Sequence, residues 1–227
     1  MLTNKAIIKI IIVLLLLACL LFYLFYKVKE PFNKNISNKQ IIFLGDSILN
    51  NSNYVDSTET VLYQFQQLVN TNIIMKAEDD AKLYNFNKQY NFLLNDNKYN
   101  NSNTYIIISI GGNDILGLTN KVSSNNNSEF SELIKKYNKE ISLLHSKLSK
   151  ANILLVGLYY PIDTRFSIYK DFITKWNSNM VGLGYPVIHL DTLITNNADI
   201  VSSIEPSALG SKNIATAIYN IVNKISF

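Results

Sequence analysis

The sequence contains one cysteine, eight glycines and four prolines among its 227 residues. A single cysteine, Cys19, excludes an intrachain disulfide and a cysteine-based metal site. The low glycine and proline content excludes a linker protein and a fibrous repeat protein. Hydrophobic residues make up 48% of the chain, which is enough for a sizeable core, and the length predicts one domain with at most a short appendage.

Most of the chain also lacks an excess of charge of either sign. The formal net charge is +4, but residues 1–34 hold five lysines and one glutamate, so 16 of the 21 basic and 16 of the 17 acidic residues lie beyond them. A neutral body does not suit a nucleic-acid surface, and we expect no nucleic-acid partner. The excess lies beside an apolar segment, which favours a role at the edge of a membrane.

That apolar segment covers residues 10–26 and contains no charged side chain. Together with residues 6–8 it supplies about the 20 residues that a bilayer-spanning helix needs. Tyr23 and Tyr26, followed by lysines, suit a membrane interface. We therefore expect an N-terminal transmembrane helix within an anchor over residues 1–29, a linker over residues 30–39 and a folded domain over residues 40–227.

The fate and orientation of the anchor are less constrained. Residues 16–19 loosely resemble a bacterial lipoprotein box ending at Cys19, but bulky residues follow and favour an uncleaved anchor. Lysines flank both ends of the apolar segment, so the positive-inside rule does not decide the orientation. Our expectation is a single-pass membrane protein whose domain lies outside the cytoplasm, in a periplasmic, extracellular or luminal space.

Strand and helix patterns alternate five times after the linker. Short β-branched or apolar runs predict strands, and longer runs with helical spacing predict helices. The predicted strands are residues 40–44, 72–75, 104–110, 152–156 and 186–190, and the predicted helices are residues 58–69, 86–94, 129–148, 166–180 and 207–225. This alternation predicts an α/β fold: a three-layer, doubly wound, five-stranded parallel sheet covered by helices on both faces.

Polar clusters follow the predicted strands, and ligands of such folds bind at the carboxyl ends of the strands. The clusters are residues 45–47, 111–114 and 202–206. Ser47, after a glycine that lets the chain turn, is a candidate nucleophile. Asn113 offers an amide donor for an oxyanion, and Glu205 offers a carboxylate base. Each cluster taken alone is also ordinary turn or capping chemistry, so their joint order carries the hypothesis.

In this order the clusters resemble the blocks of the SGNH hydrolases, also called GDSL esterases and lipases. Gly45-Asp46-Ser47 is similar to the first block, and Gly111-Gly112-Asn113-Asp114 is similar to the third. The resemblance spans about residues 40–226 and implies a flavodoxin-like SGNH fold. It also implies Ser47 as the nucleophile and Asn113 and Gly112 at the oxyanion site, with Asp46 and Asp114 in support.

Two departures from the family pattern bear on activity. At the place of the second-block glycine, whose N–H joins the oxyanion hole, this chain has Ala81; a backbone N–H survives that change. In the fifth block, Ser202 replaces the usual aspartate and Glu205 the usual histidine. The two histidines, His145 and His189, fall outside this block, and we expect both to be structural.

Three functions remain open. The first is an esterase acting on acyl groups, such as O-acetyl groups of glycans, with Ser47 as nucleophile and Glu205 as an unusual base. The second is an inactive SGNH-like module that binds a glycan, a lipid or a protein. The third is an envelope acyltransferase. We expect a small acyl-ester, glycan or lipid substrate, a membrane contact through the N-terminal helix, no cofactor and no metal.

Overall fold

The computed structural model of the protein describes residues 38–118 and 126–224, together with Leu17 and Cys19. The chain divides into two units, Met1–Lys34 and Asn35–Phe227, and the fold concerns the second. The predicted anchor and linker lie outside the described residues apart from positions 17, 19, 38 and 39. Among the residues that are described, no helix has the length and hydropathy to cross a membrane.

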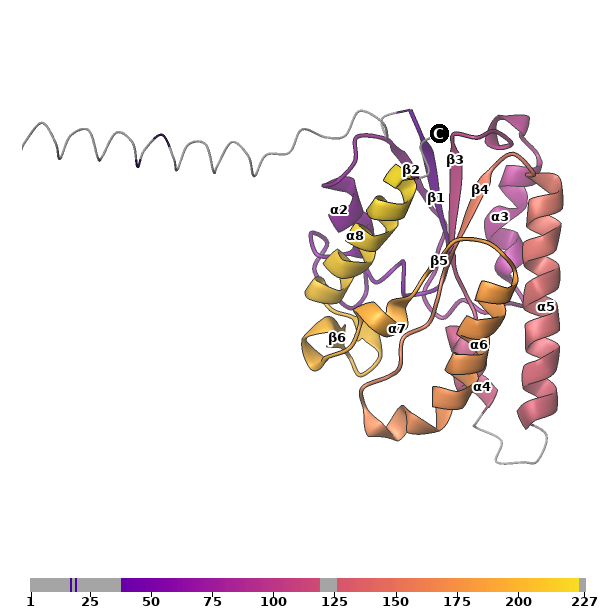
Figure 1. Cartoon of the computed structure of the whole chain (residues 1–227), viewed down its shortest axis with the longest axis vertical. Coiled ribbons are helices and arrows are strands. Elements are labelled where there is room, and N and C mark those ends of the chain that lie inside the picture. The colour runs from indigo at the N-terminus through magenta and orange to yellow at the C-terminus, as the bar shows by residue number, and fades with distance from the viewer. Residues whose placement is uncertain (1–16, 18, 20–37, 119–125, 225–227) are drawn as a thin grey trace, which may run out of the picture. The chain divides into compact units, whose positions relative to one another are not determined.

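A five-stranded, wholly parallel sheet forms the middle layer, as the alternating pattern predicts (Figure 1). Its spatial order is β2-β1-β3-β4-β5, with the first strand near the centre. The strands are β1 (Gln40–Gly45), β2 (Asn72–Met75), β3 (Thr104–Ser109), β4 (Asn152–Val156) and β5 (Val187–Ile188). This is the flavodoxin-like order, and it places the ends of β1 and β3 side by side at the switch point where ligands bind.

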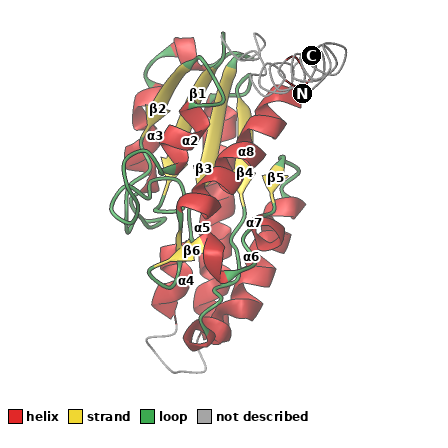
Figure 2. Ribbon diagram, turned by 90° about the vertical axis from the view of Figure 1, so that its left-hand side faces the viewer, coloured by secondary structure: helices red, strands yellow, loops and turns green. Residues whose placement is uncertain are grey.

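Helices cover both faces of this sheet (Figures 1 and 2). On one side lie α2 and α8, which pack against each other, and on the other side lie α3 and α5. The helices are α2 (Val61–Gln66), α3 (Phe86–Leu94), α4 (Gly112–Leu118), α5 (Asn126–Lys147), α6 (Lys170–Gly182), α7 (Leu190–Leu193) and α8 (Ala208–Lys224). The predicted three-layer architecture is therefore confirmed.

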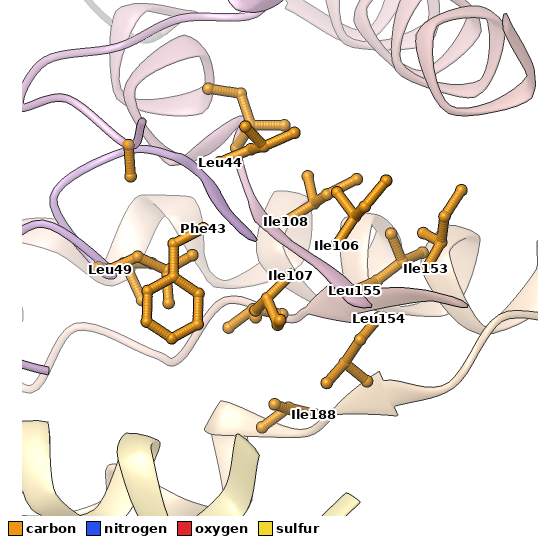
Figure 3. Close-up of a cluster of buried hydrophobic side chains, with 14 of the residues drawn as sticks. Phe43, Leu44, Leu49, Ile106, Ile107, Ile108, Ile153, Leu154, Leu155 and Ile188 are labelled. Atoms are coloured by element: carbon orange, nitrogen blue, oxygen red, sulfur yellow. The ribbon is translucent and has the colours of Figure 1, made fainter. Parts of the chain in front are cut away.

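The core consists of side chains that alternate between the two faces of the sheet (Figure 3). Phe43 is paired with Ile107, and Ile107 with Leu154, so these three lie on one face. Phe43 also meets the ring of Phe65 from α2 in an edge-to-face contact with centroids 5.4 Å apart. Because both faces are buried, the strands are apolar throughout rather than alternating, which is why they stand out in the sequence.

The largest departures from the predicted elements lie outside the central strands. The helix predicted for residues 58–69 is only α2, capped by the Thr60 hydroxyl, which accepts from the N–H of Tyr63 at 3.1 Å. The helix predicted for residues 166–180 is a 3₁₀ segment, η3 (Thr164–Tyr169), followed by α6. The strand predicted for residues 186–190 has two residues, because β5 lies at the edge and pairs only with the end of β4. Helix α4 and a small antiparallel hairpin, β6 (Ile200–Val201) with β7 (Glu205–Pro206), were not predicted.

Two buried amide side chains complete the hydrogen bonding where strands end. Gln89 of α3 accepts from the N–H of Gly45 at 2.6 Å and donates to its carbonyl at 2.8 Å. Asn177 of α6 does the same for Leu158, just beyond β4, at 2.8 and 2.7 Å. Buried backbone groups must be paired, so these side chains replace the missing strand neighbours. They fix the chain where it leaves the sheet.

We predict that Gln89→Met, which keeps the length of the side chain but removes both hydrogen bonds, lowers the free energy of unfolding by about 1–3 kcal/mol. The loss arises because the buried N–H of Gly45 is left unpaired, whereas the Gly45 carbonyl keeps the N–H of Glu78 as a donor. Urea unfolding followed by circular dichroism measures it. The exposed Gln66 provides the matched control, and Gln66→Met should change stability by less than about 0.5 kcal/mol. Equal stability of the two variants would contradict this role for Gln89.

Candidate active site

The ends of β1 and β3 and the β6–β7 hairpin enclose one small hollow of about 60 Å³. Ser47, Asn113 and Glu205 all line it, together with Asp46 and Gly112. Segments 158 residues apart in the sequence therefore meet at one place. The rest of the lining is mainly apolar: Ile48, Ile115, Leu116, Leu158, Tyr159, Pro161, Tyr169, Ile173 and Ile204.

The turn that presents Ser47 depends on Gly45. Its φ of +129° lies in a region that favours glycine, and a Cβ at this position would overlap the Ser109 carbonyl oxygen of β3. The N–H of Asp46 donates to that same carbonyl at 2.8 Å. The chain therefore leaves β1 pressed against β3, and Ser47 follows with only 7% of its surface exposed.

Asp46 fastens this turn to β3. Its Oδ1 accepts from the Ser109 hydroxyl at 2.8 Å and from the N–H of Ile48 at 3.2 Å. The pKa of Asp46 is raised to about 7, chiefly by burial; the two hydrogen bonds act in the opposite direction, and the charges of Glu205 and Asp114 add smaller increases. The carboxyl is therefore an unusually weak acid in the folded protein.

Glu205 brings a second buried carboxyl to the hollow. It is distant from Ser47 in the sequence, but both residues line the same hollow. It lies on β7, directly across the hairpin from Val201, and is 7% exposed. Burial raises its pKa, and the charges of Asp79 and Asp80 raise it further, whereas the Ser47 hydroxyl lowers it as a hydrogen-bonding neighbour. The buried Oε2 atom of Glu205 has no hydrogen-bond partner. Catalytic hydrogen bonds are often completed only when substrate is bound.

A tight turn connects the two strands of the hairpin that carries Glu205. Ser202 and Ser203 form its turn with φ of +48° and +72°, both in the left-handed region. Ser202 therefore turns the chain and does not line the hollow. Ser203 accepts a hydrogen bond from the guanidinium of Arg165 at 3.2 Å, which ties the turn to η3.

Two residues that the sequence did not indicate hold this hairpin in place. The Tyr159 hydroxyl donates to the carbonyl of Ile204, next to Glu205. The buried Asn51 donates to the carbonyl of Pro206 at 3.2 Å and accepts from the N–H of Val61 at 3.0 Å. Tyr159 lies three residues after the end of β4. Because ligands of such folds bind at the carboxyl ends of strands, this position could have been predicted to lie near the site. Asn51, four residues after Ser47, gave no such signal.

Two of the predicted oxyanion residues, Asn113 and Ala81, are hydrogen-bonded to each other. The side-chain amide of Asn113 donates to the Ala81 carbonyl at 3.2 Å. The N–H of Ala81 donates to the Glu78 carbonyl across a longer 3.3 Å contact. In this loop the residue with a left-handed, glycine-like backbone is Asp80, with φ of +56°. Asn113 is therefore in direct contact with the 80–81 loop.

The remaining predicted residues lie outside the hollow. Asp114 accepts from the N–H of Leu83 at 2.9 Å, which joins α4 to the 80–83 loop, and burial raises its pKa. His189 is half exposed at the start of α7, 3.7 Å from Asp191. The ring of His145 contacts Tyr185 on the α5 face. No imidazole lines the hollow. Within residues 38–118 and 126–224 no group of three or more acidic, histidine or cysteine side chains is placed to hold a metal ion.

This arrangement can support acyl chemistry at a serine. A hydroxyl, a carboxyl with a raised pKa and an amide donor share a small hollow with a mainly apolar lining. Carboxylates can act as general bases when their pKa is brought towards the working pH. The apolar lining suits a hydrocarbon group next to the reacting carbon.

Comparisons with known proteins support the same fold. The sequence matches no protein-family model and no curated protein. A GDSL-family lipolytic protein of Veillonella parvula aligns with a TM-score of 0.63 and 16% identity, over 81% of this chain and 97% of that chain. A lipase from a goat rumen metagenome aligns with a TM-score of 0.65 and 16% identity, over 79% of this chain and 95% of that chain. A family 3 carbohydrate esterase of Clostridium thermocellum aligns with a TM-score of 0.57 and 17% identity, over 83% of this chain and 99% of that chain. At these identities the likeness establishes a shared fold: the chain has the SGNH/GDSL lipase and esterase fold over about 80% of its length.

The raised pKa of Asp46 predicts that the protein becomes less stable as the pH rises. A folded-state pKa of about 7, against about 3.9 in an unfolded chain, means that the folded state binds more protons between these values. The contribution of Asp46 is therefore complete below pH 4 and is lost as the pH rises through 7, by an amount on the order of 2–4 kcal/mol. Urea unfolding at pH 5 and pH 8 measures the difference.

Asp46→Asn, which cannot ionise but can still accept from Ser109 and Ile48, should remove this part of the pH dependence. Asp171→Asn, at an exposed position of α6, is the control and should keep it. An unchanged pH dependence in Asp46→Asn would show that the Asp46 carboxyl is ionised in the folded protein throughout this range.

Proposed function

We propose that this protein is a serine esterase acting on short acyl esters, with Ser47 as the nucleophile and Glu205 as the general base. The observation that carries the proposal is the shared hollow. The Ser47 hydroxyl and the Glu205 carboxyl both line it, and the hydroxyl lowers the pKa of the carboxyl as a hydrogen-bonding neighbour. The SGNH/GDSL fold, in which solved lipases and esterases are found, supports the same assignment.

The reaction follows from these two groups. Glu205 takes the hydroxyl proton while the Ser47 oxygen bonds to the ester carbonyl carbon. The bond to the alcohol oxygen then breaks, and the alcohol leaves with the proton that Glu205 returns. Water attacks the acyl-serine next and gives one proton to Glu205. The carboxylic acid departs as that proton returns to Ser47, which regenerates the site.

Glutamate can serve here because its environment differs from water. An ordinary glutamate, with a pKa near 4.3, is a poor base at neutral pH. Burial and the neighbouring charges of Asp79 and Asp80 raise the pKa of Glu205, which increases its basicity whenever it is ionised. The absence of an imidazole still implies slow turnover, since loss of one member of a catalytic triad lowers turnover by about 10⁴–10⁶-fold in a known serine protease.

Asn113 and the 80–81 loop are the proposed oxyanion donors. A side-chain amide nitrogen carries two N–H groups, and only one is used in the bond to the Ala81 carbonyl. The backbone N–H groups of Asp80 and Ala81 lie in the adjoining turn. One preorganised donor of this kind contributes about 2.7–4 kcal/mol to a transition state.

The size of the hollow limits the acyl group. A volume of about 60 Å³, with isoleucine and leucine side chains at its walls, fits an acetyl group or a slightly longer acyl chain. A long fatty chain would have to leave the hollow. Acetyl esters, including O-acetyl groups on glycans, are therefore the proposed substrates.

We further propose that residues 1–29 anchor the domain to a membrane, outside the cytoplasm, with residues 30–39 as the linker. The uncharged run over residues 10–26 and the lysines that flank it support this placement. The substrates would then be esters of the cell envelope or of the extracellular space. Protease digestion of intact cells, followed by release of the domain, tests the placement.

A serine-directed fluorophosphonate should label the full-length protein on Ser47, because the probe needs an activated hydroxyl in an accessible site. Ser47→Ala should abolish the label. Ser52→Ala, which alters an exposed serine of the same segment, should retain it. If the wild-type protein takes up no label between pH 6 and pH 9, the protein is an inactive SGNH-like module instead.

Glu205→Gln should reduce kcat for p-nitrophenyl acetate by about 10²–10⁴-fold with little change in KM, because glutamine cannot accept the proton. In the wild type, kcat/KM should fall with decreasing pH at a pH above that of an ordinary glutamate, since the pKa of Glu205 is raised. Glu205→His, which places an imidazole with an ordinary pKa of about 6.5 beside Ser47, should increase turnover. Equal rates for Glu205→Gln and wild type would exclude Glu205 as the base.

A further inference from the structure

Carboxylates without counter-ions surround one side of the candidate site. Asp79 and Asp80 raise the pKa of Glu205, and burial followed by Glu205, Asp79 and Asp80 raises the pKa of Tyr54. The four side chains therefore lie within electrostatic reach of one another. Across residues 38–118 and 126–224, no lysine, arginine or histidine forms an ion pair with any of the three carboxylates.

Hydrogen bonds hold this group beside Ser47. The N–H of Glu78 donates to the Gly45 carbonyl at 3.0 Å, so the loop that carries Asp79 runs along the end of β1. Asp79 accepts from the side-chain amide of Asn53, the residue before Tyr54. The chain from Ser47 to Tyr54 and the 78–80 loop are thus joined at a single place.

Two carboxylate oxygens here are buried and unused. Oε2 of Glu205, a residue that is only 7% exposed and lines the hollow at Ser47, has no hydrogen-bond partner. Oδ1 of Asp79 is likewise buried without a partner. A buried, unpaired carboxylate is costly, so a ligand that supplies positive charge or N–H donors would relieve both atoms.

A second, larger hollow of about 450 Å³ adjoins the β6–β7 hairpin. Tyr54 and Val201 line it, and Val201 is paired with Glu205 across the hairpin. Its only charged lining residues are Asp56 and Glu59. The space on the other side of this residue pair is therefore also acidic, and it could hold the alcohol part of an ester.

We propose that the alcohol part of the substrate carries a cation, a quaternary ammonium or a protonated amine, held between Asp79, Asp80 and Glu205 beside the ring of Tyr54. The proposal rests on the esterase function proposed above and defines its substrate class. Carboxylates and an aromatic ring together are the usual recognition chemistry of such cations.

A matched pair of esters tests the proposal with the full-length protein in a non-ionic detergent. Acetylcholine and 3,3-dimethylbutyl acetate have the same shape and the same acetyl group, but only the first is charged. We expect kcat/KM to be about 10–30-fold higher for acetylcholine at low salt. The ratio should fall with added sodium chloride because salt screens the interaction.

Asp79→Asn and Asp80→Asn should each reduce the ratio about threefold or more. Asp96→Asn is the matched control, since Asp96 is exposed and paired with Lys98 far from the site, and it should leave the ratio unchanged. A ratio near one in the wild type would overturn the cation site while leaving the esterase function intact.

Calorimetric titration of Ser47→Ala with tetramethylammonium provides a readout that does not need catalysis. If neither ester is hydrolysed but tetramethylammonium binds, and Asp79→Asn weakens that binding, the cation site stands and the esterase function fails. If neither ester is hydrolysed and tetramethylammonium does not bind, both proposals fail.

Discussion

A buried glutamate beside a buried serine is the constraint on which the site of this protein depends. Neither side chain exposes more than 7% of its surface, and no imidazole lies between them. Burial destabilises the charged form of a carboxyl, so a buried carboxyl is usually protonated or stabilised by hydrogen-bond donors. The surrounding structure keeps the glutamate in this position all the same. Tyr159 holds the residue before it, and Asn51 holds the residue after it. The position of Glu205 is therefore specified by its neighbours on both sides.

Buried side chains also hydrogen-bond to backbone groups elsewhere around the hollow. Gln89 and Asn177 are buried amides that bond to backbone groups of a segment leaving the sheet, and the buried Asn51 bonds to the start of α2 and to β7. A parallel sheet leaves such groups unpaired where its strands stop, and a side chain with both a donor and an acceptor can satisfy them. The loops at this edge therefore have defined positions although they carry little secondary structure. That rigidity is what a site needs to hold a nucleophile, a base and an oxyanion donor in a fixed geometry.

The sequence was sufficient to predict the central layer and the convergence of Ser47, Asn113 and Glu205, but not the loops that hold these residues in place. The isoleucines of residues 106–108 are buried on both faces, and a continuous β-branched run predicts that environment directly. Gly45 and the cluster at residues 111–114 could be placed because strand ends converge in a parallel sheet. The β6–β7 hairpin could not, since two serines in the left-handed region are not a typical turn signal. Tyr159 and Asn51 act through contacts between distant segments, which leave no local pattern.

The central claim is that Ser47 forms a covalent acyl intermediate with Glu205 as its base. Mass spectrometry of the full-length protein, quenched in acid after reaction with p-nitrophenyl acetate, tests it most directly. The account predicts one acetyl group on the peptide that contains Ser47. An ester that is hydrolysed while the acetyl group resides on another residue, or on none, would contradict it.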